Sequence, residues 1–202
     1  DEVVCGMGRT GKWFGYQHFN VKPDMVTMAK GVASGYAAIS VLATTEDLFN
    51  EFLAEPSDKM HYFRDISTFG GCAGGPAAAL ENMRIIEEEN LLDNVVKQGD
   101  YCLERLHELK DKYPVIGDVR GKGLFLGAEL VKDRETREPL DESLVAGVAA
   151  DCLRQGVMIG RTNRSLPKYN NTLCLSPALI CTKDDIDEII NSIDVALGNL
   201  EM

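Results

Sequence analysis

The chain has 202 residues, of which 45% are hydrophobic and 26% are charged, a balance that is ordinary for a globular protein. Its 32 acidic and 21 basic residues give a formal net charge of −11, and such a surface would repel both nucleic acid and anionic membranes. No apolar run reaches the roughly 18 residues that a transmembrane helix needs. The start, Asp1–Val4, lacks Met and the basic residues of a signal peptide, which suggests a chain cut from a longer one.

Asp1–Cys5 is the first segment with strand character. We predict that it is the end of a strand, which then enters a glycine-rich loop at residues 6–15. Two further apolar runs, Met25–Ala29 and Ile39–Ala43, have the length of short strands. The first part of the chain is therefore expected to alternate short strands with glycine loops.

Two helical segments are predicted next. Residues 44–47, Thr-Thr-Glu-Asp, have the composition of a capped helix start. After a second glycine loop at 69–75, Pro76 suits the first turn of a longer helix over 77–113. Unbroken, that helix would be roughly 54 Å long, but Asn90 is a candidate kink or break. Its apolar stripe comprises Leu92, Val95, Val96, Gly99, Leu103, Leu106 and Leu109.

Pro114 ends this helix, and the remaining pattern is typical of an α+β module with the order β-β-α-β-β-α. The last helix is preceded by Thr182 and Asp185 at the spacing of a capping box. The expected strands lie at 115–119, 123–131, 157–160 and 173–175, and the expected helices at 141–155 and after residue 182.

Six cysteines are spread along the chain without a C-x-x-C pair, and no histidine lies at metal-ligand spacing from them. This usage is typical of unpaired, mostly buried thiols in a reducing compartment. We therefore expect a cytoplasmic protein with no metal site. The cysteines are Cys5, Cys72, Cys102, Cys152, Cys174 and Cys181.

Two phosphate-binding patterns overlap in the first glycine loop. Gly6–Gly11 matches the G-x-G-x-x-G pattern of dinucleotide-binding proteins, and Gly6–Lys12 matches the G-x-x-x-x-G-K pattern of a P-loop. Both patterns require a helix that begins within the motif, and nothing after Gly11 resembles one. A P-loop also needs Ser or Thr where this chain has Trp13. We therefore predict a glycine-rich turn beside an active site.

An ordered set of motifs extends from the start of the chain to Tyr36. It comprises Asp1-Glu2-Val3, Gly8-Arg9-Thr10-Gly11, Phe14-Gly15, His18, Pro23-Asp24, Ala29-Lys30-Gly31 and Gly35-Tyr36. This set resembles the signature of class III, fold-type-I pyridoxal-phosphate aminotransferases, and the resemblance covers the whole chain. It implies an α/β fold with three parts: the C-terminal portion of the cofactor-binding large domain at 1–76, a long connecting helix at 77–113 and a small α+β C-terminal domain at 114–202.

The resemblance also implies roles for two residues toward pyridoxal 5'-phosphate. Asp1 would lie against the pyridine nitrogen and keep it protonated, so that the ring can accept electrons from the substrate carbon. Lys30, at the end of the run Met25–Ala29, would bind the cofactor aldehyde and later move a proton between the substrate and the cofactor. Small neighbours on either side, Ala29 and Gly31, would leave room for the cofactor.

Three further positions follow from the same resemblance. Thr68 matches the threonine that binds the cofactor phosphate of the neighbouring subunit, which implies a homodimer, or a dimer of dimers, with shared active sites. Arg161 and Arg164 are alternative candidates for binding the acid group of the substrate, because a guanidinium can bind a carboxylate or a sulfonate with two hydrogen bonds. Arg120, in the motif Arg-Gly-Lys-Gly-Leu, is expected to be mostly structural.

Within the family, residues 70–76, 85–92 and 160–174 look most like the members that act on taurine and pyruvate. This implies transfer of the amino group of taurine, or of a similar ω-amino acid, to pyruvate, which gives sulfoacetaldehyde and alanine. Another ω-amino acid or amine–pyruvate transaminase remains an alternative, as does a non-catalytic assembly module. Because family chains are roughly twice as long, we expect this fragment alone to be inactive.

Overall fold

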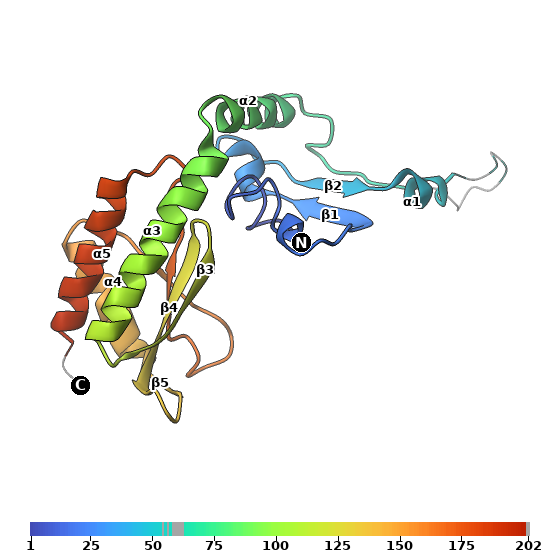
Figure 1. The fold of residues 1–202 in the computed structure, drawn as a ribbon. Helices are drawn as coiled ribbons and strands as arrows, with labels where there is room; N and C mark the ends of the chain where they lie inside the picture. Colours follow the sequence, from blue (N-terminus) through green and yellow to red (C-terminus); the bar gives the residue numbers. More distant parts are fainter. Residues whose placement is uncertain (54, 56, 58–62, 201–202) are drawn as a thin grey trace. The chain divides into compact units, whose positions relative to one another are not determined.

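The computed structural model of the chain describes residues 1–53, 55, 57 and 63–200. It contains two compact units, Asp1–Asn90 (unit 1) and Leu91–Met202 (unit 2). Each unit has its own β-sheet, with two strands in unit 1 and five in unit 2 (Figure 1). The expected α/β fold class is therefore observed.

Unit 1 contains an antiparallel pair of strands, in which Met25 lies opposite Thr44 and Met28 lies opposite Val41. The first strand was expected at this position, whereas the second begins two residues later than its apolar run. Thr45 accepts a hydrogen bond from the Leu48 amide at 3.4 Å and caps a short helix, which confirms the predicted helix start. The elements are η1 (Gly15–His18), β1 (Met25–Met28), η2 (Lys30–Ala33), β2 (Val41–Thr44), α1 (Glu46–Asn50) and α2 (Gly74–Glu88).

The strand expected at Asp1–Cys5 is wrong, because residues 3–10 form consecutive turns. Asp1 Oδ1 accepts a hydrogen bond from the Val3 amide at 2.9 Å, and the Glu2 carbonyl accepts one from the Gly6 amide at 3.0 Å. These local bonds use groups that strand pairing would need. One backbone hydrogen bond, from the Glu2 amide to the Thr27 carbonyl at 2.8 Å, joins this segment to β1.

The single connecting helix expected over 77–113 is two helices, α2 in unit 1 and α3 (Leu91–Lys112) in unit 2. The break falls at Asn90, which has a left-handed backbone with φ of 53°. Asparagine tolerates this conformation better than most residues, and a helix commonly ends at such a residue. The candidate break is therefore confirmed, and the uninterrupted helix is corrected.

Unit 2 is built on an antiparallel sheet in the order β3-β4-β7-β6, with β5 paired to the other part of β4. Helices α3 and α4 pack against the strands, and α5 packs against both helices (Figure 1). The predicted order β-β-α-β-β-α is observed, with β5 added. The elements are β3 (Ile116–Lys122), β4 (Phe125–Asp133), β5 (Glu138–Pro139), α4 (Glu142–Arg154), β6 (Gly160–Arg161), β7 (Thr172–Leu175) and α5 (Lys183–Gly198).

The core of unit 2 forms where one face of the sheet meets the helices. Leu126, Ala128 and Leu130 alternate along β4 and are buried, which gives that strand one apolar face. Leu106 of α3 and Ile190 of α5 are also fully buried, and burial of each such side chain contributes about 1.5–3 kcal/mol. Within the described residues, we find no helix long and apolar enough to cross a membrane.

The start of α5 and the bounds of β6 can be compared with the helix cap and the strand that the sequence predicts. Thr182 accepts a hydrogen bond from the Asp185 amide, and the Asp185 carboxylate accepts one from the Thr182 amide at 2.7 Å, so the predicted capping box is confirmed. The strand expected at 157–160 is corrected to Gly160–Arg161. Residues 157–159 follow a helix end at which the Val157 amide donates to the Cys152 carbonyl, so that amide is not available for strand pairing.

Candidate functional site

The first glycine loop lacks the helix that a nucleotide site requires. Gly8 and Gly11 lie in turns with φ of 88° and 85°, which are left-handed conformations that glycine adopts without strain. The next helical element is the four-residue η1, which begins at Gly15. Both phosphate-binding patterns are therefore coincidental, and the predicted glycine-rich turn is confirmed.

The carboxylates of Asp1 and Glu2 lie in different environments. Asp1 is exposed, and one of its oxygens caps the turn at Val3. Glu2 is 6% exposed, and its two carboxylate oxygens accept hydrogen bonds from the amides of Gly15 and Tyr16, each at 2.8 Å. The exposed carboxylate is thus accessible to a ligand, whereas the buried one is used within the protein.

Lys30 lies where β1 has ended and η2 begins, and its side chain is exposed. Its backbone is left-handed, with φ of 47°, which is uncommon for a residue that has a Cβ atom. The following turn is held from α2, where the Asn82 side-chain amide donates to the carbonyls of Gly31 and Val32 at 2.8 and 3.1 Å. Strained conformations of this kind concentrate at functional sites.

The segments that contain Asp1 and Lys30 are neighbours within unit 1. The Glu2 amide bonds to Thr27, three residues before Lys30, and a Cβ atom placed on Gly31 would lie 3.4 Å from Met7 Cβ. An exposed acid, which can accept a hydrogen bond from a protonated pyridine ring, and an exposed amine, which can bind an aldehyde, lie on adjoining segments. These residues therefore fit pyridoxal phosphate.

Thr68 is exposed in a turn in which the Gly70 amide donates to the Ser67 carbonyl at 2.9 Å. Thr68 therefore lies at the surface of unit 1.

Arg161 and Arg164 both belong to unit 2, on and just after β6. Arg161 is half-buried, and its guanidinium donates to the Thr162 carbonyl at 3.3 Å. Arg164 exposes its side chain, while its backbone amide donates to Asn170 Oδ1 at 2.6 Å and its carbonyl accepts from Asn170 Nδ2 at 3.0 Å. The tight backbone bonds fix the course of the loop at Arg164 without using its guanidinium.

Arg120 lies in β3 and forms ion pairs with Asp118 and Glu129, both at 2.7 Å. It stands in register with Gly127 of β4, which in turn stands in register with Cys174 of β7. Burial raises the pKa of the Cys174 thiol, and the charges of Arg164 and then Arg120 oppose that shift. The charges of both arginines thus affect the thiol of Cys174 on β7. The ion pairs of Arg120 agree with a mostly structural role for this residue.

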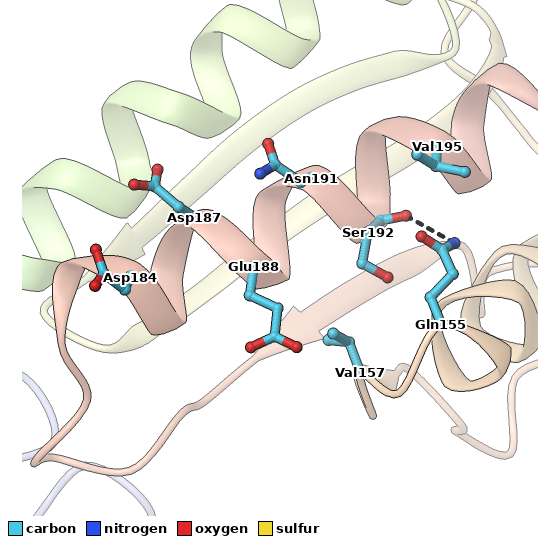
Figure 2. Close-up of a pocket in the computed structure, with 8 residues that line it drawn as sticks. All are labelled: Gln155, Val157, Asp184, Asp187, Glu188, Asn191, Ser192 and Val195. Carbon is cyan, nitrogen blue, oxygen red and sulfur yellow. Dashed lines mark hydrogen bonds between the residues drawn. The ribbon is translucent and has the colours of Figure 1, made fainter.

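The pocket in Figure 2 lies in unit 2 and has a volume of about 450 Å³. It is formed mainly by α5, and the Gln155 side-chain amide donates to the Ser192 carbonyl at 3.3 Å across one side of it. Asp184 and Glu188 contribute acidic groups. It contains none of the residues that the sequence assigns to the cofactor or to the substrate.

Sequence reasoning missed two residues that hold the predicted site. Glu2 belongs to the first motif, but the motif gives no sign that it is buried and binds two amides. Asn82 falls within the helix predicted over 77–113, and the helical pattern does not reveal that it holds the turn after Lys30. A single sequence offers no signal for either, because their partners lie more than ten positions away along the chain.

The description "Aminotransferase class-III" belongs to the family model that matches residues 1–197. The chain is 66% identical over 197 residues to a hypotaurine/taurine–pyruvate aminotransferase of Paracoccus denitrificans (strain Pd 1222), with 98% of this chain and 43% of the relative aligned. It is 62% identical over 200 residues to a taurine–pyruvate aminotransferase of Rhodobacter capsulatus, with 99% and 44% aligned.

Among solved structures, the chain resembles an aminotransferase of Bacillus anthracis with a TM-score of 0.94 at 42% sequence identity. That alignment covers 98% of this chain and 44% of the solved chain. The chain therefore belongs to the class III aminotransferases, which are pyridoxal-phosphate-dependent transaminases. It spans less than half the length of these relatives.

Proposed function

We propose that the protein to which this chain belongs transfers the amino group of taurine, or of a similar ω-amino acid, to pyruvate, with pyridoxal 5'-phosphate as cofactor. The observation that most supports this is the pair of exposed groups on adjoining segments, the Asp1 carboxylate and the Lys30 amine. The two curated relatives named above are called aminotransferases of taurine or hypotaurine and pyruvate. Sulfoacetaldehyde and alanine would be the products from taurine.

In this proposal, pyridoxal phosphate supplies an aldehyde that binds amines and a ring that accepts electrons. Asp1 holds a proton at the pyridine nitrogen and so favours electron acceptance. Lys30 would hold the cofactor through its aldehyde, and its amine would carry a proton between the substrate carbon and the cofactor carbon. Its exposure at the end of β1 leaves its amine free to do both.

Thr68 would bind the cofactor phosphate of a second copy of the protein through its hydroxyl group, which implies a homodimer or a dimer of dimers. Arg161 or Arg164 would bind the sulfonate or carboxylate of the substrate. Unit 1 would be the C-terminal portion of the large domain and unit 2 the small domain, with α3 assigned to the latter. We propose that this fragment alone is inactive and that the protein is cytoplasmic.

The test uses the full-length protein in unaltered, Lys30→Ala and Lys22→Ala forms. We expect the unaltered protein and Lys22→Ala, which removes another exposed lysine of unit 1, to show the visible absorbance of a lysine-bound cofactor and to form alanine from taurine and pyruvate. Lys30→Ala should lose both, since its covalent bond and its proton transfer disappear together. A visible band that persists in Lys30→Ala would refute the assignment of the lysine.

The amino donor is tested separately with the unaltered protein. A panel of taurine, hypotaurine, β-alanine and neutral amines, each with pyruvate, measures kcat/KM for every donor. Taurine or hypotaurine should rank first. A neutral amine in first place would favour the alternative, an amine–pyruvate transaminase, while leaving the family and the cofactor unaffected.

A further inference from the structure

Glu2 is buried and makes three long-range hydrogen bonds. Its carboxylate accepts from the amides of Gly15 and Tyr16, and its own amide donates to the carbonyl of Thr27, all at 2.8 Å. Its carbonyl accepts from the amide of Gly6 at 3.0 Å. One residue thus ties together the start of the glycine loop, its end and strand β1.

The carboxylate of Glu2 is buried, and each of its oxygens has one backbone partner. With 6% of Glu2 exposed, the charge has lost most of its water, and two backbone amides replace it. Each of its two oxygens accepts from one backbone N–H group. Burial, and after it the charge of Glu2, raises the pKa of the neighbouring Cys5 thiol.

The glycines around Glu2 show how closely the loop is packed on it. A Cβ atom on Gly6 would lie 2.7 Å from the Glu2 carbonyl oxygen, a distance that real Cβ atoms do not reach. A Cβ atom on Gly15 would lie 3.0 Å from Cys5 Cβ and 3.4 Å from a Glu2 carboxylate oxygen. The side chain of Glu2 therefore has little freedom to move without moving the loop.

Glu2 is also placed between the two groups that the proposed function uses. It follows Asp1 directly, and it bonds to Thr27, three residues before Lys30. A shift of Glu2 would move the backbone from which the Asp1 carboxylate extends. A rigid support of this kind is what a carboxylate needs in order to meet a ring nitrogen at a fixed distance.

We propose that Glu2 is a positioning residue, which holds the carboxylate of Asp1 in register with Lys30 through its buried bonds to Gly15, Tyr16 and Thr27. This inference rests on the proposed function. A glutamine at position 2 has nearly the same shape, but its amide group would direct a donor toward one of the two N–H groups. Glu2→Gln therefore tests the charge and the acceptor pattern while leaving the size of the side chain nearly unchanged.

The experiment compares Glu2→Gln with Gln17→Ala in the full-length holoenzyme. Gln17 is the matched control, since its side-chain oxygen accepts from the Phe14 amide at 3.1 Å and so supports the same loop without a bond to Asp1 or β1. The readouts are the thermal midpoint without cofactor, kcat and KM, and the pH midpoint at which the visible absorbance of the lysine-bound cofactor changes.

For Glu2→Gln we expect kcat to fall about 10-fold with KM little changed, because the loss concerns positioning rather than substrate binding. The pH midpoint should rise by about half a unit: a proton held less firmly at the ring nitrogen repels the proton at Lys30 less. Gln17→Ala should lower the thermal midpoint and leave the pH midpoint unchanged.

An unchanged pH midpoint in Glu2→Gln, or an equal rise in Gln17→Ala, would show that Glu2 is only structural. If Glu2→Gln does not fold, Gly15→Ala decides by the same measurements, because its methyl group would lie 3.0 Å from Cys5 Cβ and would displace the backbone that donates to the Glu2 carboxylate. If the unaltered protein has no visible cofactor band, the proposed function fails and this inference fails with it. A normal band combined with an unmoved midpoint overturns this inference alone.

Discussion

Lys30 and Glu2 differ in how they can be recognised, the first from the sequence motif around it and the second from its contacts in the folded chain. Lys30 could be singled out because an ordered motif surrounds it in the sequence, and the structure adds a left-handed backbone that is held from α2 by Asn82. Glu2 stands in the same motif, yet its burial depends on amides 13 and 14 positions away. Motifs therefore predict the groups that meet the cofactor, whereas contacts reveal the groups that support them.

The two candidate arginines differ at this scale in a way that an experiment can use. We expect Arg161→Ala or Arg164→Ala to lower kcat/KM for taurine about 10- to 100-fold more than for a neutral amine, since truncation of one partner of a desolvated charge pair costs about 2 kcal/mol or more. Steady-state kinetics on the full-length enzyme measure both donors. Arg154→Ala, which removes an exposed arginine paired with Asp151, is the control. Equal losses for both donors would contradict the role.

At the scale of elements, hydrophobic periodicity predicted most of the buried face of α3, but not the close contact between this helix and the turn that joins β3 to β4. The apolar stripe predicted for α3 largely agrees with the buried face of that helix. Val96, which belongs to the predicted stripe, is 44% exposed, whereas Cys102, which does not belong to it, is buried. Gly99 explains part of the geometry, because a Cβ atom there would lie 2.7 Å from the Gly123 Cα atom, in the turn between β3 and β4. The helix can approach that turn only where it lacks a side chain.

Two helical glycines provide a matched prediction. Gly99→Ala should destabilise unit 2 by about 2–3 kcal/mol, because backbone atoms cannot yield to the methyl group. Gly147→Ala, in α4, meets nothing within 4 Å and should stabilise the helix by up to about 1 kcal/mol. Urea unfolding followed by circular dichroism measures both. Similar effects of the two substitutions would show that the contact at Gly99 is unimportant.

At the scale of the whole molecule, the two units differ in how much core they contain. Unit 2 encloses a continuous apolar cluster contributed by its sheet and three helices. Among its described residues, unit 1 buries few large hydrophobic residues and exposes many. More than half of the residue surface is exposed at Phe19, Val21, Tyr36, Ile66, Phe69 and Leu80. The stability of the chain therefore resides mainly in unit 2.

Two carboxylates of unit 2 with lowered pKa values predict how the stability of this unit changes with pH. The hydrogen bond from Lys112 lowers the pKa of Asp194, and the one from Lys183 lowers the pKa of Asp187. A carboxylate whose pKa is depressed in the folded state stabilises that state at any pH above its ordinary pKa of 3.8. This contribution is lost as the pH falls below 3.8 toward the depressed pKa of the folded state. We expect the thermal midpoint of unit 2 to fall as the pH drops below about 4.

The substitution that isolates this effect is Asp194→Asn, which keeps the shape of the side chain and removes its charge. Its thermal midpoint should depend less steeply on pH between about 2 and 4 than that of the unaltered chain. Asp111→Asn removes an equal charge from α3 and leaves the pair of Lys112 and Asp194 intact, so its profile should keep the original slope. A steep profile in Asp194→Asn would refute the assignment.

The sequence by itself determined the family, the α/β class, the order of elements in unit 2, the capping box of α5 and the candidate residues Asp1, Lys30, Thr68, Arg161 and Arg164. These follow from local spacing and from motifs, which are written in consecutive residues. Only the tertiary structure decided that Asp1–Cys5 is a turn, that the helix breaks at Asn90 and that Glu2 is buried. The turn depends on local hydrogen bonds that compete with strand pairing, and the helix break depends on the left-handed backbone of Asn90. The burial of Glu2 depends on amides 13 and 14 positions away in the chain.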